Sequence, residues 1–195
     1  MIRNDAEVGT SVTLKPDLQR IQFRSPDEKR IVQVGPDVVS AHILRPYTSW
    51  EDFRQQIAGA LDAYVRVVEP PSIAQIGMRY INRLQIGEDP VDLPTYFTSP
   101  PNPPEGLPQA LESFLTRIVS RYDDAPIKLV TTFADGPTPT GEPEFILDID
   151  LVWAFETPQL PIEGAMEAID DLRVREREAF EALITDNARS LFDAD

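Results

Sequence analysis

Cysteine is absent from this 195-residue chain, and histidine occurs once, as His42. The lack of cysteine excludes disulfides, thiolate nucleophiles and cysteine metal sites. A single histidine excludes a metal centre built from several histidines of one chain, and any Ser/His catalytic pair that does not use His42. Because His42 stands in a predicted strand beside Ala41 and Ile43, we interpret it as a structural or surface residue and not as a base. We expect no metal and no cofactor.

Long apolar runs and phosphate-binding loops are also missing. No run approaches the roughly 18 residues that a membrane-spanning helix needs, and the first ten residues lack the apolar core of a signal peptide. Glycine-rich loops of the Walker or dinucleotide-binding type are absent. The sequence therefore predicts a cytoplasmic protein that has no membrane partner.

Basic residues are few relative to acidic ones. The chain has 18 lysines and arginines against 33 acidic residues, a formal net charge of -15. A field of that sign repels phosphate backbones, so we do not expect nucleic acid as a partner. The length and an apolar fraction of 42% suit one well-buried core. We predict a single domain over residues 1–195, with a frayed polar start at residues 1–11.

The longest alternating segment covers residues 73–86 and predicts a β-strand at the centre of the chain. Successive side chains of a strand point to opposite faces. One face of this segment is apolar except for Asn82, whose amide we expect to be buried and bonded to the backbone, since an unpaired one costs about 1–3 kcal/mol. The other face carries Arg79 and Arg83.

Residues 145–155 form a second alternating segment, which is a candidate partner for the first strand. Asp148 and Asp150 leave one face of it, opposite to large apolar residues. We favour ion pairs with Arg79 and Arg83. The alternative, a shared cation or acid–base chemistry, has less support because calcium commonly takes six or more oxygen ligands and no second acidic motif joins these two. These four residues are the candidate binding surface, and we assign no catalytic residue.

Short extended runs predict an antiparallel meander in the first part of the chain. The three strands of this meander cover residues 18–24, 30–34 and 38–44, and residues 11–14 begin a separate short strand. Thr48 and Glu51 have the spacing of a capping box that starts a helix. Apolar residues then recur every three or four positions until Pro70 and Pro71 end the helix. Such a stripe is typical of a core face, with a cofactor box as the remote alternative.

Residues 87–108 contain seven prolines and predict an irregular crossing, with neither helix nor central strand. Tyr96 and Phe97 indicate that this crossing packs across the body of the protein; the alternative is a proline-rich ligand for another protein's groove. Further elements are predicted beyond it. Residues 109–122 fit both a helix and a strand, and we favour a strand over residues 113–122. A strand over residues 127–134 and a helix over 162–192, with arginines and glutamates on its outer side, follow.

This order of elements predicts an α+β fold, in which a curved antiparallel sheet is covered on one face by two long helices. The two halves, each a set of strands followed by a helix, suggest a loose structural repeat. The apolar sides of the elements predict one buried cluster. Its expected members are Trp50, Phe53, Ile57, Tyr64, Met78, Tyr80, Leu147, Ile149, Trp153 and Phe180.

Several stretches between residues 20 and 192 resemble a sporadically distributed bacterial family of uncharacterised proteins with a Leu-Arg-Tyr-Ile-Asn-type motif. The stretches are Met78-Arg-Tyr-Ile-Asn82, Arg24-Ser-Pro-Asp with Val32-Gln-Val-Gly-Pro36, Tyr47-Thr-Ser-Trp-Glu51, Leu147-Asp-Ile-Asp150 and Phe180-Glu-Ala-Leu-Ile-Thr185. The family has no established activity and no assigned catalytic residue. The resemblance therefore implies an architecture but no chemistry, and the patchy occurrence of the family suggests a defence or toxin–antitoxin setting.

Two classes of function fit these observations. We favour a non-enzymatic protein-binding or regulatory module whose partner is another protein chain. The alternative is a small-molecule-binding or enzymatic domain with a pocket between sheet and helices. A cavity that brings together Arg79, Arg83, Asp148 and Asp150 favours the alternative, whereas a continuous apolar patch on a sheet edge or helix favours the protein-binding module.

Overall fold

A computed structural model describes residues 11–13, 20–88, 90–137, 141–157 and 159–192. The chain separates into two compact units, Met1–Pro71 (unit 1) and Ser72–Asp195 (unit 2). The boundary follows the two prolines that were predicted to end the first helix. Apart from Ser11, the predicted frayed start lies outside the described residues. The single domain predicted from the length stays a prediction.

Unit 1 has an antiparallel sheet in the order β1-β2-β3-β4, followed by helix α1. Its elements are β1 (Ser11–Thr13), β2 (Ile21–Arg24), β3 (Arg30–Gly35), β4 (Val38–Ile43) and α1 (Trp50–Val68). Short links favour pairing of sequential strands. In the link between β2 and β3, the Ser25 N–H donates to the Arg30 carbonyl at 2.9 Å. The predicted meander is confirmed.

Side chains of α1 bond to the backbone of its own unit. Gln56 donates from Nε2 to the carbonyls of Ile31 and His42, each at 3.2 Å. The buried Tyr64 donates its hydroxyl to the Pro36 carbonyl at 3.0 Å. These bonds connect α1 to β3, to β4 and to the turn between them.

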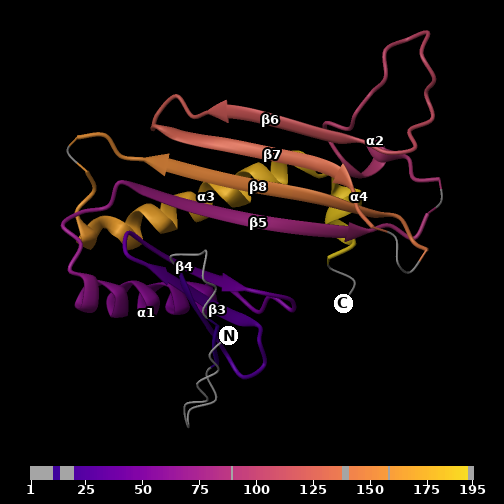
Figure 1. Cartoon of the computed structure of the whole chain (residues 1–195). Coiled ribbons are helices and arrows are strands. Elements are labelled where there is room, and N and C mark those ends of the chain that lie inside the picture. Colours follow the sequence, from indigo (N-terminus) through magenta and orange to yellow (C-terminus); the bar gives the residue numbers. More distant parts are fainter. Residues whose placement is uncertain (1–10, 14–19, 89, 138–140, 158, 193–195) are drawn as a thin grey trace. The chain divides into compact units, whose positions relative to one another are not determined.

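Unit 2 contains a second antiparallel sheet, in the order β5-β8-β7-β6 (Figure 1). Its strands are β5 (Gln75–Gln85), β6 (Leu115–Arg121), β7 (Ile127–Asp135) and β8 (Glu144–Ala154). Strands β5 and β8 pair over their full length, from Gln75 opposite Ala154 to Gln85 opposite Glu144. The two alternating segments of the sequence are therefore partners, as predicted.

Helix α3 (Ala165–Leu183) packs on one face of this sheet, against β5 and β8 (Figure 1). It follows the short 3-10 helix η1 (Ile162–Gly164) and precedes α4 (Asp186–Ser190). The covered face is built from odd positions of β8, where Leu147, Ile149 and Leu151 are almost fully buried. Among the described residues of unit 2, no helix covers the opposite face.

The α+β class with antiparallel sheets is confirmed, but the predicted single sheet under two long helices is not. The two 19-residue helices belong to different units, and each unit has its own sheet. The sheet is not continuous because β4 pairs with β3 while β5 pairs with β8. Both units have four strands before a long helix, yet their strand orders differ, so a structural repeat is not established.

The core of unit 2 gathers aromatic residues that the predicted cluster omitted. Phe97 and Phe133 have ring centroids 4.4 Å apart, and Phe145 lies 5.6 Å from Phe97. The buried members of this cluster are Leu84, Ile86, Tyr96, Phe97, Phe133, Phe145, Leu147, Ile184 and Ala188. Of the predicted core residues, Tyr64, Met78, Leu147 and Ile149 are buried, and Trp50, Phe53, Ile57, Tyr80, Trp153 and Phe180 are half-buried.

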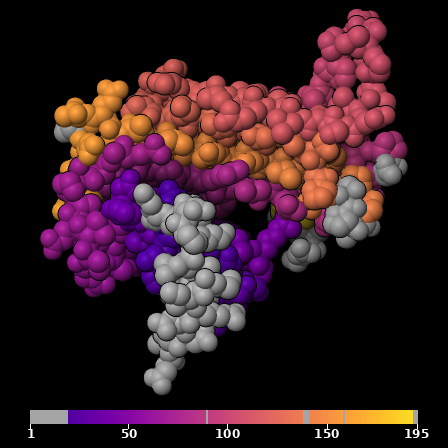
Figure 2. Space-filling view, viewed as in Figure 1, coloured from indigo at the N-terminus to yellow at the C-terminus, as the bar shows by residue number. Residues whose placement is uncertain are grey.

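The proline-rich segment packs as predicted through Tyr96 and Phe97, both of which are buried. It is not wholly irregular, since α2 (Leu93–Tyr96) forms one helical turn. Pro94 lies in the first turn of α2. Proline is tolerated there because backbone N–H groups of the first turn have no hydrogen-bond partner within the helix. Residues 98–112 then extend as a loop beyond the sheet (Figures 1 and 2).

Candidate functional site

The four predicted binding residues lie on the face of the unit 2 sheet opposite to α3. In the register of β5 and β8, Arg79 is opposite Asp150 and Ile81 is opposite Asp148. Because side chains alternate along both strands, all of these point away from the covered face. The strand parity predicted from the sequence is confirmed.

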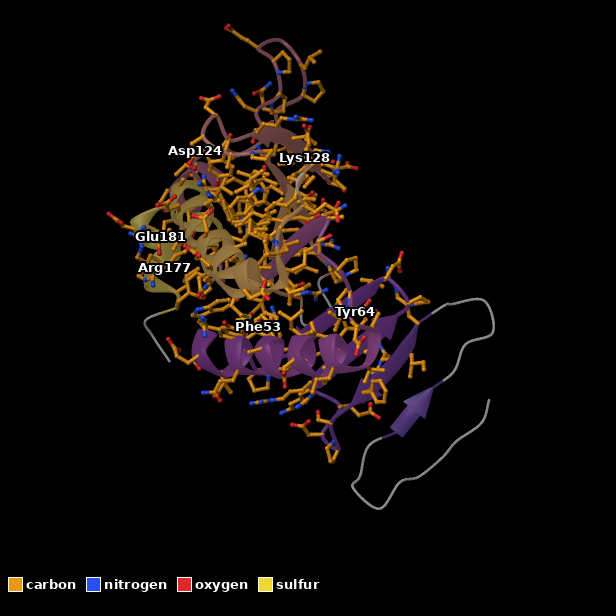
Figure 3. All side chains as sticks on the ribbon, turned by 90° about the vertical axis from the view of Figure 1, so that its left-hand side faces the viewer. Phe53, Tyr64, Asp124, Lys128, Arg177 and Glu181 are labelled. Carbon is orange, nitrogen blue, oxygen red and sulfur yellow. The ribbon has the colours of Figure 1, made fainter. Side chains whose placement is uncertain are left out.

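We call this surface the open face. Its residues include, taken strand by strand, Arg79, Ile81 and Arg83; Ile146, Asp148, Asp150 and Val152; Lys128, the buried Val130, and Thr132; Leu115, Arg117, Val119 and Arg121. Figure 3 shows Lys128 on one side of the sheet and Arg177 and Glu181 of α3 on the other. The open face therefore combines aliphatic side chains with charges of both signs.

Arg79 and Asp148 form a two-pronged ion pair across the strands. Arg79 Nε donates to Asp148 Oδ1 at 2.9 Å, and Nη2 donates to Oδ2 at 2.6 Å. The arginine reaches diagonally, because the residue directly opposite is Asp150. The pair raises the pKa of Arg79 through its hydrogen bond to Asp148. Its parallel geometry holds both side chains in one orientation.

Asp150 lies near the positive charges of Arg79 and Arg117 but forms no ion pair among the described residues. In the part of the chain that the structure describes, the neighbouring arginines Arg79 and Arg83 form their ion pairs with Asp148 and Glu144, and no side chain hydrogen-bonds the Asp150 carboxylate. Burial raises the pKa of Asp150, and the attraction of Arg79 and Arg117 opposes that rise. Its carboxylate can therefore accept a donor from outside the chain.

Arg83 does not pair with either aspartate. Its Nη1 donates to Glu144 Oε1 at 2.9 Å, and the glutamate is buried. The Gly136 N–H donates to the Glu144 carbonyl at 2.7 Å, and a Cβ on this glycine would lie 2.9 Å from Glu144 Oε1. Glu144 was missed because it precedes the predicted segment, although it continues the even spacing of Asp148 and Asp150.

A hollow of about 700 Å³ lies between the proline-rich segment and the nearby ends of β7 and β8. Its lining comes from residues 90–94, 101–103, 109–114, 135–136 and 143–145. None of the four predicted residues lines it, and none of the lining residues belongs to α1 or α3. The hollow is therefore not the predicted pocket between sheet and helices.

Asp92, Asp135 and Glu144, which line the hollow, accept hydrogen bonds from other groups of the chain. Asp135 accepts the Phe114 N–H at 2.7 Å and the Ser113 hydroxyl at 3.0 Å. The hydrogen bond from Phe114 lowers the pKa of Asp135 most, with a further contribution from Ser113. Within the described ranges, no group of three or more His, Asp or Glu residues is placed to hold a metal ion.

Two polar residues singled out in the sequence have structural contacts. Asn82 donates from Nδ2 to the Leu147 carbonyl at 3.2 Å, which confirms its expected bond to the backbone. His42 Nε2 lies 3.0 Å from Ser40 Oγ. No carboxylate of the described residues hydrogen-bonds the His42 ring, so this pair lacks the third group that orients a catalytic histidine.

No protein-family model, curated protein or solved structure matches this chain. The resemblance carried by the Met78–Asn82 motif therefore stays a prediction. Among the described helices, none is long and apolar enough to cross a membrane. The open face and the hollow are thus the physical basis for a functional proposal.

Proposed function

We propose that this chain is a non-enzymatic protein-binding module and that the open face of unit 2 is its binding surface. The carrying observation is Ile81, which is 54% exposed and stands between Arg79 and Arg83. On the open face Ile81 is framed by charged side chains, and a protein interface has this arrangement of an apolar centre surrounded by a polar rim.

The ion pair beside Ile81 supports binding through preorganisation. Arg79 and Asp148 already hold each other, so they lose little side-chain freedom when a partner binds. The carboxylate of Asp150 can accept a hydrogen bond from a donor group of the partner. Charges of this kind favour specificity and register more than affinity.

A small-molecule or enzymatic role is the second candidate and has weaker support. The hollow is large enough for a ligand. However, Asp135 and Glu144 already accept hydrogen bonds from Phe114 and Arg83 of the same chain. From the resemblance we further propose a defence or toxin–antitoxin system as the setting, and from the composition the cytoplasm as the location.

The test is affinity purification of the tagged chain from its host cells, followed by mass spectrometry. We expect a protein that co-purifies in about equimolar amount and is lost when Ile81→Asp places a charge at the centre of the open face. Val67→Asp is the matched control, because Val67 is 84% exposed on α1. Co-purification that is absent, or equal for both variants, would overturn the proposal.

A further inference from the structure

Strand β6 forms one edge of the unit 2 sheet and pairs only with β7 among the described strands. In Figures 1 and 2 it runs along the upper rim of this sheet. The strand has seven residues, Leu-Thr-Arg-Ile-Val-Ser-Arg, with no proline and one-to-one register against β7. Edges of this kind are templates for another strand unless they are blunted by proline, by a bulge, by charged side chains or by covering elements. Strand β6 lacks the proline and the bulge, and its charges, Arg117 and Arg121, restrict which strand can pair with it.

The hydrogen bonds at both ends of β6 show which backbone groups point outward. The Tyr122 N–H donates to the Ile127 carbonyl at 3.0 Å, and the Asp135 N–H donates to the Phe114 carbonyl at 3.4 Å. Bonded pairs alternate along an antiparallel ladder, so even-numbered residues of β6 bond to β7. The N–H and C=O groups of the odd residues therefore point away from the sheet. These residues are Leu115, Arg117, Val119 and Arg121.

Apolar side chains along this edge are exposed on both faces of the sheet. Leu115 and Val119 are 69% and 51% exposed on the open face, and Ile118 is 51% exposed on the other. A shallow hollow of about 310 Å³ adjoins Ser120 and the α3 residue Ala182. A strand added at β6 would cover these side chains and place one of its own over the hollow.

The edge carries positive charge in a chain whose net charge is -15. Arg121 lies directly opposite Lys128 on the open face. Arg117 is on the same face of β6, four residues before Arg121 in the sequence. None of these three forms an ion pair within the described part of the chain. Like charges directly opposite each other destabilise a strand pair. This cost is offset where a bound group brings negative charge.

A second copy of β6 fits this edge poorly. Antiparallel pairing centred on Ile118 would set Arg117 against Val119 of the copy and place Arg117 diagonal to both arginines of the copy, adding cations to cations. The charge pattern instead matches a carboxylate-bearing strand.

We propose that β6 pairs with an extended acidic segment of a partner protein, which adds a fifth strand to the sheet. The proposal rests on the protein-binding function and specifies the partner. In the antiparallel case, acidic residues four apart face Arg121 and Arg117. Apolar or β-branched residues face Ser120, Val119 and Ile118, the first of them over the shallow hollow. Main-chain bonds supply affinity, and the alternating side chains supply specificity.

The test uses the full-length protein and a capped synthetic peptide, Glu-Leu-Thr-Val-Glu-Thr-Val, with binding followed by fluorescence anisotropy. Arg117→Gln and Arg121→Gln should each weaken binding by about twofold to fivefold, the effect of an exposed cross-strand charge pair. Lys29→Gln, an equal charge change in a turn of unit 1, should leave binding unchanged. The same peptide with lysines for both glutamates should bind at least tenfold more weakly.

Two changes test strand pairing itself. Val119→Pro removes an outward N–H without removing a bond to β7, so it should weaken binding at least tenfold while circular dichroism stays unchanged. If that variant misfolds, the peptide can be N-methylated at its third and fifth residues instead. This change removes the peptide N–H groups that would bond to β6, so it should weaken binding in the same way. Binding that survives N-methylation, or that ignores the arginine changes, would overturn the proposal.

The remaining outcomes separate this proposal from the function on which it rests. A dimer in sedimentation that Val119→Pro dissolves would assign the edge to a second copy and refute the acidic partner. Binding of a single-stranded oligonucleotide in place of the peptide would refute it also. If the peptide fails while Ile81-dependent co-purification persists, only the β6 proposal fails; loss of both removes the protein-binding function.

Discussion

At the scale of single residues, Glu176 of α3 is almost fully buried although it belongs to a helix rich in charge. It accepts a hydrogen bond from Arg173, and the Arg173 guanidinium lies 4.8 Å from the centroid of the Tyr80 ring. Burial raises the pKa of Glu176, and the attraction of Arg173 opposes this rise. The expectation that glutamates lie on the outer side of this helix is therefore wrong for Glu176.

This burial predicts a pH dependence of stability. The folded-state pKa of Glu176 lies above its ordinary value of 4.5, so the contribution of the group is fully present below that value. It is lost as the pH rises through the folded-state pKa. Relative to Glu176→Gln, the wild-type free energy of unfolding should therefore fall as the pH rises from 4.5 through the folded-state pKa.

The measurement is urea denaturation of both proteins at several pH values. Glu178→Gln is the control, because Glu178 is exposed on the same helix. A difference between wild type and Glu176→Gln that stays constant with pH would contradict the raised pKa.

At the scale of elements, the start of α1 shows how a local motif is shifted by one residue. The capping box predicted Thr48 as the N-cap, but the structure has Ser49, whose Oγ accepts the Asp52 N–H at 3.1 Å. Both Thr48 and Ser49 have a hydroxyl that can cap a helix, and serine is the more favourable N-cap of the two. Here the helix begins at Trp50, so Ser49 has the position from which a side chain reaches the third following N–H.

Ser49→Ala should lower the free energy of unfolding by about 1 kcal/mol, the usual cost of a lost N-cap. Thr48→Ala should change it by less than about 0.5 kcal/mol, as is usual for an exposed site. Chemical denaturation of the two variants compares them directly. A larger loss for Thr48→Ala would restore the capping box predicted from the sequence.

At the scale of the whole molecule, the two units differ in how many side chains they bury. Among the described residues, unit 1 has two buried apolar side chains, Ile31 and Tyr64, and the other buried apolar residues belong to unit 2. A small domain with few buried apolar residues is marginally stable. Unit 1 should therefore be the first to unfold.

The chain has one tryptophan in each unit, Trp50 and Trp153. Single-tryptophan variants, Trp153→Phe and Trp50→Phe, make the fluorescence of each unit separately visible. We expect the Trp50 signal to change at a lower urea concentration than the Trp153 signal, with circular dichroism as the common reference. Coincident curves would contradict this order and support the single domain that the length predicts.

The sequence by itself determined the two central strands of unit 2 and the face on which each of their residues lies. Period-two alternation is a local property of the backbone, so it identified β5 and β8 and placed Arg79, Arg83, Asp148 and Asp150 together. Short links likewise determined the meander of unit 1. These conclusions need only neighbours along the chain.

Tertiary structure alone decided which groups meet. Arg79 forms an ion pair with Asp148, and Arg83 forms one with Glu144. These partners follow from the strand register and from the reach of each side chain, which the whole sheet determines. Tertiary structure also divided the strands between two sheets and brought Phe97, from a segment without a period, against Phe133. The bare edge of β6 likewise depends on the strand order. Contacts between residues distant in sequence arise from packing, and no local pattern encodes them.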